Sequence, residues 1–236
     1  MTIRLDKLLV DRGMGSRKEV RKLVKKGLVE VDGVVNRHYD GHVDPGAVIT
    51  IEGVEVEALP EVVVWHKPVG VVSSTHDDHG RSDLSDALPG AWAGKLHPVG
   101  RLDAETSGLL LFSLEGKVTQ WLLHPRRAVE RSYVAIVEGR PEGAALAARM
   151  AGGVETAEGT FTARVDGVEG AVVRLTVTEG KHRMVRRMLA NAGHPVLELS
   201  RVRYGGFELG ELMPGESRAA SAEELAWLRS IGAPGI

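Results

Sequence analysis

The sequence contains no cysteine, which removes disulfide bonds, thiolate metal sites and cysteine nucleophiles from consideration. Aromatic residues are scarce, at 4% of 236 residues, so the chain has few side chains for stacking large ring systems. No apolar run reaches the roughly 20 residues that span a membrane, and charges interrupt the N-terminus too early for a signal peptide. We therefore expect a cytoplasmic protein that is not inserted in a membrane.

Charge is distributed unevenly, although the formal net charge of the whole chain is only −2. Residues 1–27 carry nine basic and three acidic side chains, whereas the remaining chain carries 21 basic and 29 acidic ones. This asymmetry predicts a small basic module joined to a larger acidic body. A basic module suits a polyanion such as RNA, but a solvated helix face explains the same charges equally well.

The N-terminal segment has a helix-helix-strand pattern. Apolar residues recur on one helical face from residue 5, and Ser16 with Glu19 forms the capping-box pattern that begins a second helix. A strand is expected at residues 28–31, and Asp32-Gly33 predicts a hairpin turn after it. The pattern of this segment therefore predicts a small domain of two helices and a short sheet.

The second part of the chain alternates short valine-rich strands with helices. We expect a first domain at residues 1–58, a linker at 59–61 and a second domain at 62–236. Hairpin-like turns at Asp166-Gly167 and Glu169-Gly170 favour antiparallel pairing, so the expected class is α+β with a central, mainly antiparallel sheet flanked by helices. Expected strands are 62–65, 133–138, 160–166, 171–178 and 196–202, and expected helices are 117–123, 144–150, 182–191 and 223–231.

The segment 100–111 combines glycines, charges and hydroxyls with an apolar run. Asp103 stands between Arg101 and the pair Thr106-Ser107, so its carboxylate has polar partners within reach, as a catalytic carboxylate needs. The same pattern is typical of an aspartate that caps a helix or pairs with Arg101, and such structural aspartates are much commoner.

Four segments of the second domain resemble, in order and spacing, the RNA pseudouridine synthases that carry an N-terminal S4 domain. The segments are 66–74, 100–111, 124–134 and 179–188, and residues 2–53 are similar to the S4 RNA-binding domain itself. The resemblance implies a monomeric enzyme that isomerises a uridine of ribosomal RNA to pseudouridine, either in naked RNA or within a ribosomal assembly intermediate. The large-subunit (23S) branch of the family is favoured, and a uridine of the small-subunit (16S) RNA is the alternative target.

The resemblance also assigns catalytic and base-binding roles. It implies Asp103 as the catalytic carboxylate, Tyr133 as the residue against the uracil, and Lys181 as the cation that keeps the carboxylate ionised. Without the resemblance, Tyr133 would be interpreted as a core residue of a strand and Lys181 as a solvated lysine at a helix start. Arg101 is a candidate to hold the site of an extruded uridine.

Further basic residues are expected to contact the RNA backbone. In the second domain these are Arg183, Arg186 and Arg187, which follow Lys181 at or near helical spacing. Met184 departs from the family, which usually has a polar residue there. In the S4 domain the expected RNA-binding residues are Arg4, Lys7, Arg17, Lys18, Arg21 and Lys22.

No cofactor or metal is expected. The isomerisation transfers neither electrons nor phosphate, and the chain has neither a P-loop nor a GxGxxG motif. The run His76-Asp77-Asp78-His79 looks like a metal cluster, but no second ligand set accompanies it. Two rival functions stay open: an inactive synthase scaffold that binds RNA during ribosome assembly, and a nucleosidase, for which Glu105 would have to supply a second carboxylate.

Overall fold

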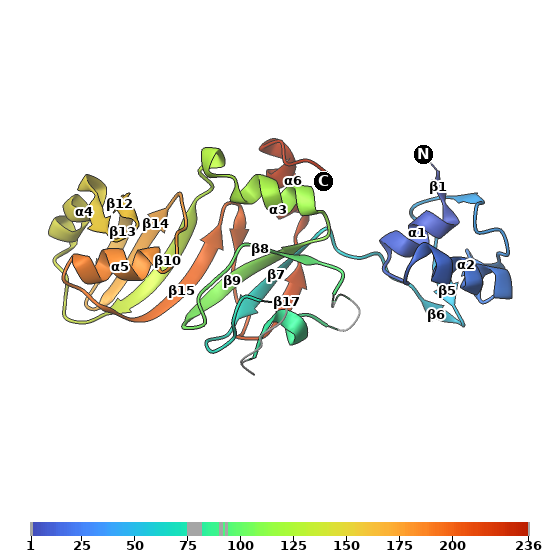
Figure 1. Ribbon diagram of the computed structural model, residues 1–236, viewed down its shortest axis with the longest axis horizontal. Coiled ribbons are helices and arrows are strands. Elements are labelled where there is room, and N and C mark those ends of the chain that lie inside the picture. Colours follow the sequence, from blue (N-terminus) through green and yellow to red (C-terminus); the bar gives the residue numbers. More distant parts are fainter. Residues whose placement is uncertain (1, 75–81, 90–91, 93, 236) are drawn as a thin grey trace. The chain divides into compact units, whose positions relative to one another are not determined.

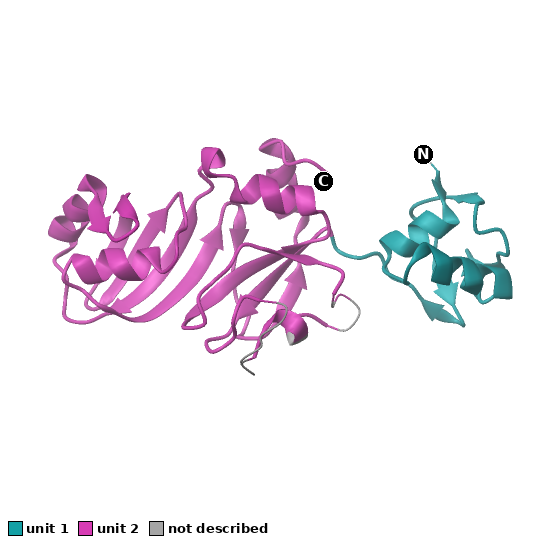
Figure 2. Ribbon diagram, viewed as in Figure 1, with its two compact units in different colours: residues 1–60 teal, residues 61–236 magenta. Residues whose placement is uncertain are grey.

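The computed structural model describes residues 2–74, 82–89, 92 and 94–235. The chain forms two compact units, Met1–Pro60 and Glu61–Ile236, which are drawn in different colours in Figure 2. Both units combine helices with mainly antiparallel strands (Figure 1), which confirms the α+β class.

The smaller unit packs two helices against short strands. Its second helix begins at Ser16 with the expected capping box, and it ends at Gly27, which has a left-handed backbone with φ +73°. Asp32 and Gly33 both have positive φ, as a two-residue type I′ hairpin turn requires. Its elements are β1 Ile3–Arg4, α1 Leu5–Asp11, α2 Arg17–Lys26, β2 Val29–Val31, β3 Val34–Val35, β4 His42–Val43, β5 Ile49–Ile51 and β6 Val54–Glu55.

The larger unit is built on one central sheet. Its strands are β7 Val62–Lys67, β8 His97–Val99, β9 Thr106–Ser113, β10 Arg131–Val137, β11 Val154–Thr156, β12 Gly159–Phe161, β13 Arg164–Glu169, β14 Val172–Val177, β15 Val196–Tyr204, β16 Phe207–Glu208 and β17 Ser217–Ala219. Its helices are α3 Gly116–Leu123, α4 Gly143–Gly152, α5 Met184–Asn191 and α6 Ala222–Ser230, with 3₁₀ turns at Leu84–Asp86 and Pro125–Arg127.

Nine strands in the described part of the chain form this sheet, in the order β13-β14-β10-β15-β9-β7-β17, with β16 beside β15 and β8 beside β9. Among these strands, only β15 and β9 run parallel to each other. Side chains of β7 and β9 alternate between two hydrophobic clusters, one on each face: Val63 and Leu110 point to one face, Val64 and Leu111 to the other. The middle of each strand, residues 62–65 and 109–112, is apolar without alternation because packed side chains cover both of its faces.

One expected strand differs from the structure. Residues 160–161 lie in β12 and residues 164–166 in β13, and these two strands belong to different sheets. The dipeptide Asp166-Gly167 does not form a turn but lies within β13, where the register shifts between Val165 and Gly167. A glycine inside a strand commonly marks such a bulge, and the turn itself follows at Gly170, whose φ is +61°.

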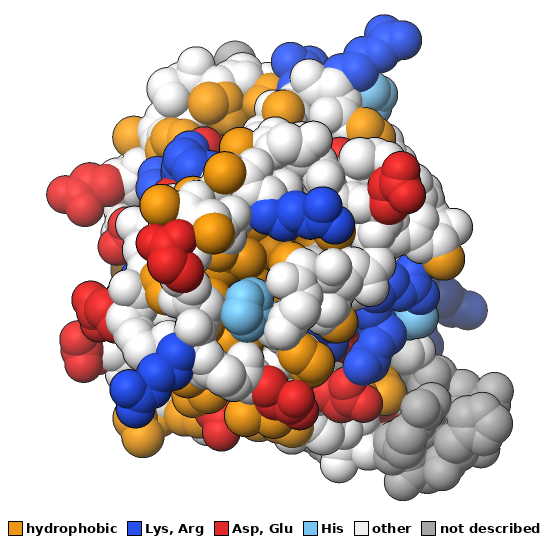
Figure 3. Space-filling view, turned by 90° about the vertical axis from the view of Figure 1, so that its left-hand side faces the viewer, with side chains coloured by type: hydrophobic (Ala, Val, Ile, Leu, Met, Phe, Trp, Pro, Cys, Tyr) orange, Lys and Arg blue, Asp and Glu red, His pale blue; other side chains and the backbone are white. Residues whose placement is uncertain are grey.

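Figure 3 shows the end of the larger unit that carries α4 and α5, where acidic, basic and apolar side chains are interspersed. Among the described residues on this face, neither sign of charge forms a continuous patch. None of the helices in the described ranges has the length and apolarity that a membrane crossing requires.

Candidate active site

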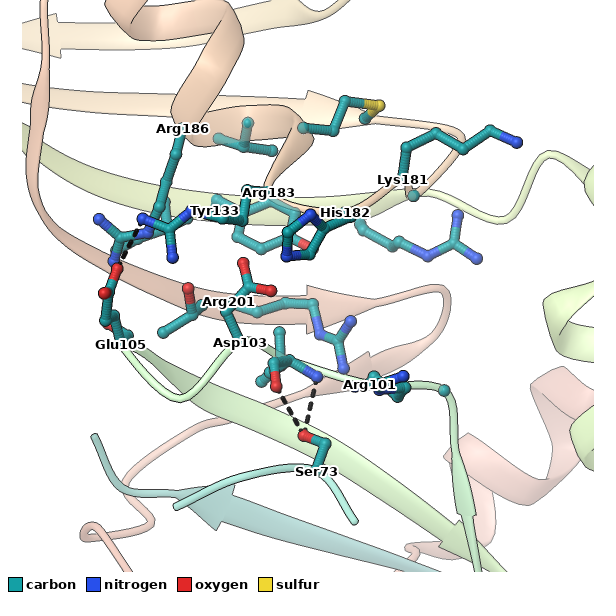
Figure 4. A pocket seen from close by; sticks show the side chains of 18 of the residues that line it. Ser73, Arg101, Asp103, Glu105, Tyr133, Lys181, His182, Arg183, Arg186 and Arg201 are labelled. Atoms are coloured by element: carbon teal, nitrogen blue, oxygen red, sulfur yellow. Dashed lines mark hydrogen bonds and ion pairs between the residues drawn. The ribbon is translucent and has the colours of Figure 1, made fainter. Parts of the chain in front are cut away.

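A cleft of about 1010 Å³ opens beside the loop that joins β8 to β9. Asp103 lies in this loop, and main-chain contacts fix it on both sides. Ser73 Oγ donates to the carbonyl of Leu102 at 2.7 Å and accepts from its N–H at 2.9 Å. Gly70 N–H donates to the carbonyl of Ala104 at 2.8 Å. The loop therefore positions the Asp103 carboxylate without using that carboxylate as an anchor (Figure 4).

Neither common structural role of an aspartate applies to Asp103. It precedes a strand rather than a helix, and among the described residues no hydrogen bond or ion pair of its carboxylate is found, including with Arg101. Three cations interact electrostatically with it: Lys67, Arg183 and Arg186. A carboxylate with nearby positive charge and no fixed partner can accept a proton or attack an electrophilic carbon.

Lys67 ends β7 directly beneath the Asp103 loop and is fully buried. Its ammonium donates to the carbonyls of Val71 at 2.6 Å, Pro68 at 2.8 Å and Ala104 at 3.4 Å. Burial lowers the pKa of Lys67 from 10.5 to about 8, while the charge of Asp103 acts in the opposite direction. Lys67 therefore stabilises the main chain of the loop and adds a positive charge below Asp103.

The shifted pKa of Lys67 predicts a pH-dependent stability. Between about pH 8 and pH 10.5 the unfolded chain holds a proton on Lys67 that the folded chain has lost, so the free energy of unfolding rises with pH across this window. Urea denaturation from pH 7.5 to 10.5 measures the effect as the difference between the wild type and Lys67→Met, which has no proton to lose. Parallel pH curves for the two proteins would show that the Lys67 pKa is not shifted.

Two arginines of the α5 region meet Glu105 at one side of the cleft. Arg183 Nη2 lies 2.7 Å from Glu105 Oε2, and this pairing raises the pKa of Arg183 and lowers that of Glu105. Arg186 donates to the main-chain carbonyl of Glu105 at 2.9 Å. Figure 4 shows both arginines grouped with Glu105, next to Asp103. Glu105 thus holds the side chains of Arg183 and Arg186 beside the Asp103 carboxylate.

Tyr133 and Arg101 also line the cleft. Tyr133 projects from β10 and is 9% exposed, so its ring offers an apolar surface close to Asp103 (Figure 4). Arg101 is exposed, at the opposite side of Asp103 from Glu105. Together with Asp103, Arg183 and Arg186, these residues are brought into one site, as the motif spacing predicts.

Lys181 and Arg187 are placed differently from expectation. Lys181 is exposed at the rim of the cleft and points away from Asp103 in Figure 4, so the structure does not make it the partner of that carboxylate. Arg187 does not line the cleft and is paired with Glu158. Met184, where the family usually has a polar residue, is 3% exposed and belongs to the hydrophobic core.

The predicted RNA-binding residues of the smaller unit fall into two groups. Arg4 and Arg21 form ion pairs with Asp6, which is only 2% exposed. Burial would raise the pKa of Asp6, but the hydrogen bonds from these arginines hold it below its usual value. Lys7 is paired with Asp11 on the surface. Exposed side chains without an ion pair among the described residues are Arg17, Lys18 and Lys22.

The described residues include no group of three or more His, Asp or Glu side chains that could hold a metal ion. The run His76-Asp77-Asp78-His79 lies outside the described residues.

Comparison with known proteins shows which family the chain belongs to. The family model described as RNA pseudouridylate synthase matches residues 61–191, which include Asp103, Tyr133 and the basic residues that follow Gly180. The chain belongs to the RNA pseudouridine synthase family. A model of the S4 domain matches residues 3–49, within the smaller unit. The expectation of an S4 domain followed by a pseudouridine synthase domain is therefore confirmed.

Individual relatives are similar in sequence to this chain along nearly its whole length. An uncharacterized RNA pseudouridine synthase of Mycobacterium tuberculosis is 39% identical, covering 96% of this chain and 92% of its own. The ribosomal large subunit pseudouridine synthase B of Bacillus subtilis is 33% identical, covering 97% and 96%. A crystal structure of a pseudouridylate synthase superposes with a TM-score of 0.66 at 27% identity, covering 96% of this chain and 99% of that one.

Three basic residues of the cleft region were not assigned a role by the sequence: Lys67, Arg131 and Arg201. All three are nearly or fully buried. A signal existed for Arg131, because it shares the period-2 spacing of the buried residues Tyr133 and Ala135 on β10. For Lys67 and Arg201 the residue type argues against burial, since lysine and arginine are rarely buried.

Proposed function

We propose that this pseudouridine synthase acts on a uridine of large-subunit ribosomal RNA, with Asp103 as its catalytic carboxylate. One observation carries the role of Asp103: its carboxylate opens on the cleft without a fixed partner among the described residues, under the influence of Lys67, Arg183 and Arg186. The name of the relative from Bacillus subtilis supports the large subunit as the source of the substrate. Small-subunit RNA is the alternative target.

The reaction breaks the bond between ribose C1′ and uracil N1, and the base turns so that C5 bonds to C1′. N1 gains a proton and C5 loses one, so no electrons leave the substrate and no co-reactant is needed. Asp103 would either attack C1′ or remove the ribose 2′ proton, and both steps require an ionised carboxylate. The ring of Tyr133 would pack against the extruded uracil, whose departure from the RNA stack exposes an apolar face.

The test of this function is pseudouridine mapping of both ribosomal RNAs from cells that lack the gene, and from the same cells carrying it again. We expect one pseudouridine of the large-subunit RNA to disappear and to return on complementation. Loss of a small-subunit pseudouridine would correct the target. An unchanged map would favour the rival in which the protein only binds RNA.

The exposed basic residues of α2 are expected to contact RNA backbone. Replacing Arg17, Lys18 and Lys22 by alanine should weaken RNA binding and reduce the slope of log K against log salt by about 2–3, because each lost phosphate contact removes roughly 0.7–0.9 from that slope. Filter binding or anisotropy at several salt concentrations measures it. Arg21 is left intact because it neutralises the buried Asp6.

A triple variant with the same charge change controls for general electrostatics. Lys117, Arg140 and Arg149 are exposed residues of the larger unit that do not line the cleft. Their replacement by alanine should leave the salt slope closer to that of the wild type. Equal slopes for the two triple variants would contradict a specific role for α2.

A further inference from the structure

Two buried arginines of the cleft share one aromatic ring. Arg131 is 8% exposed, Arg201 is 3% exposed, and Tyr204, whose ring both contact, is 1% exposed. Their guanidinium carbons lie 4.9 Å and 5.1 Å from the centre of the Tyr204 ring. Arg131 also donates to the Tyr204 hydroxyl at 3.2 Å, and that hydroxyl donates to the carbonyl of Leu122. We call Arg131 and Arg201 the buried arginine pair.

Neither arginine of the pair has a counter-ion among the described residues. Arg131 donates to the carbonyls of Val129 and Thr178, and Arg201 Nε donates to the carbonyl of Leu109 at 2.8 Å. Arg201 Nη2 is buried and has no hydrogen-bond partner in the part of the chain that the structure describes. A buried charge is costly unless it is paired, and an unpaired buried donor adds to that cost. Two adjacent buried cations without an anion therefore indicate that the anion comes from a ligand.

The position of the pair specifies where that ligand lies. Arg201 stands opposite Tyr133 in the register of β15 and β10, and both arginines line the cleft that contains Asp103. Figure 4 shows the Arg201 guanidinium on the Arg101 side of Asp103, away from the group formed by Glu105, Arg183 and Arg186. The anion would thus sit within the substrate site, on the Arg101 side of Asp103.

We propose that the buried arginine pair binds a backbone phosphate next to the target uridine. This inference rests on the proposed function, because RNA is the polyanion that the cleft would receive. Guanidinium groups match the geometry of phosphate oxygens, and burial strengthens the interaction relative to a surface contact. A phosphate held there fixes the attached ribose, so that C1′ and C2′ are presented to Asp103 in one orientation.

The experiment uses an RNA fragment that contains the mapped uridine, with one methylphosphonate replacing the phosphate on its 5′ or its 3′ side. Each methylphosphonate follows a 2′-O-methyl nucleotide, which keeps the linkage stable, and the reference is the same 2′-O-methyl fragment with a normal phosphate. Dissociation constants are measured in the Asp103→Asn background, so that no conversion takes place. We expect one of the two methylphosphonates to weaken binding by about 10- to 100-fold, since it removes a charged acceptor.

The decisive result is non-additivity. Arg201→Gln and Arg131→Gln should each weaken binding of the normal fragment by a similar factor, yet the sensitive methylphosphonate should have little further effect on these variants. Arg203→Gln is the matched control. Arg203 lies on the same strand, is exposed and makes one main-chain hydrogen bond, and its variant should keep the full methylphosphonate effect.

Thermal unfolding of each variant shows whether a loss of RNA binding comes from a loss of folding. If Arg201→Gln does not fold, Arg201→Lys replaces it, because lysine keeps the positive charge but lacks the planar guanidinium group. If the wild-type chain converts the uridine but neither methylphosphonate weakens RNA binding by the Asp103→Asn protein, the phosphate site is overturned and the enzymatic function stands. The phosphate site is also overturned if the sensitive methylphosphonate weakens binding by the Arg131 and Arg201 variants as much as it weakens binding by the protein with both arginines. A wild-type chain that converts no uridine contradicts the proposed function itself.

Discussion

Replacing Asp103 by asparagine is expected to reduce single-turnover formation of pseudouridine by at least about 10³-fold, the scale of loss when a positioned acid–base group or nucleophile is removed. Asparagine has nearly the same shape as aspartate, but its amide can neither attack C1′ nor remove the 2′ proton. Quantification of pseudouridine by mass spectrometry, with enzyme in excess over RNA, measures the change. Turnover within tenfold of the wild type would exclude Asp103 as the catalytic residue.

The variant should fold normally, because the contacts that fix the loop involve main-chain atoms of Leu102 and Ala104 and not the Asp103 carboxylate. We expect its free energy of unfolding to stay within about 0.5 kcal/mol of the wild type. RNA affinity should also change little, which distinguishes a lost chemical step from lost binding.

Glu105→Gln is the matched control, since it removes a second carboxylate of the same loop. The Glu105 side chain is 60% exposed and already occupied by Arg183. An exposed ion pair contributes little to stability, so we expect less than a tenfold loss of turnover. A loss as large as that of Asp103→Asn would instead favour chemistry that uses two carboxylates, as in the nucleosidase alternative.

Much of the fold follows from local sequence signals. The capping box at Ser16, the turn at Asp32-Gly33 and the apolar strand from Val62 all lie where their residue types predict. Each of these signals acts within a few residues of chain, so it needs no knowledge of tertiary contacts. Local signals do not suffice at Asp166-Gly167, which was predicted to form a turn and instead lies in a bulge of β13. A glycine permits a turn and a bulge equally well, and only strand pairing decides between them.

The chemistry of the site was less predictable than its location. Motif spacing brought Asp103, Tyr133 and Arg183 into one cleft. It did not determine which cations act on Asp103, because Lys181 lies just before a sharp turn in which Arg183 has a left-handed backbone with φ +53°. The direction of a side chain entering such a turn depends on packing. The same holds for Lys67 and Arg201, whose burial arises only when β7, β9 and β15 pair.

That pairing leads to a second large expected effect, at Gly108. This residue of β9 has φ +104° and faces Arg201 across the parallel junction with β15. A Cβ at Gly108 would lie 2.5 Å from the main-chain nitrogen of Arg201 and closer still to its carbonyl oxygen. Both clashing atoms belong to the backbone of a central strand, so neither can move without shifting the sheet.

Gly108→Ala should therefore lower the free energy of unfolding by about 3–5 kcal/mol, combining roughly 1–3 kcal/mol of backbone strain with a similar cost of overpacking. This corresponds to a drop of about 10 °C in the melting temperature of the larger unit, measured by calorimetry. Gly167→Ala is the control, because Gly167 also lies in a strand of this sheet but has open space around its Cβ position and no positive φ. Its cost should stay below about 1 kcal/mol, as for a strand position that tolerates a side chain. Similar losses in both variants would mean that the junction between β9 and β15 does not require a glycine, and that Arg201 is held in place by other contacts.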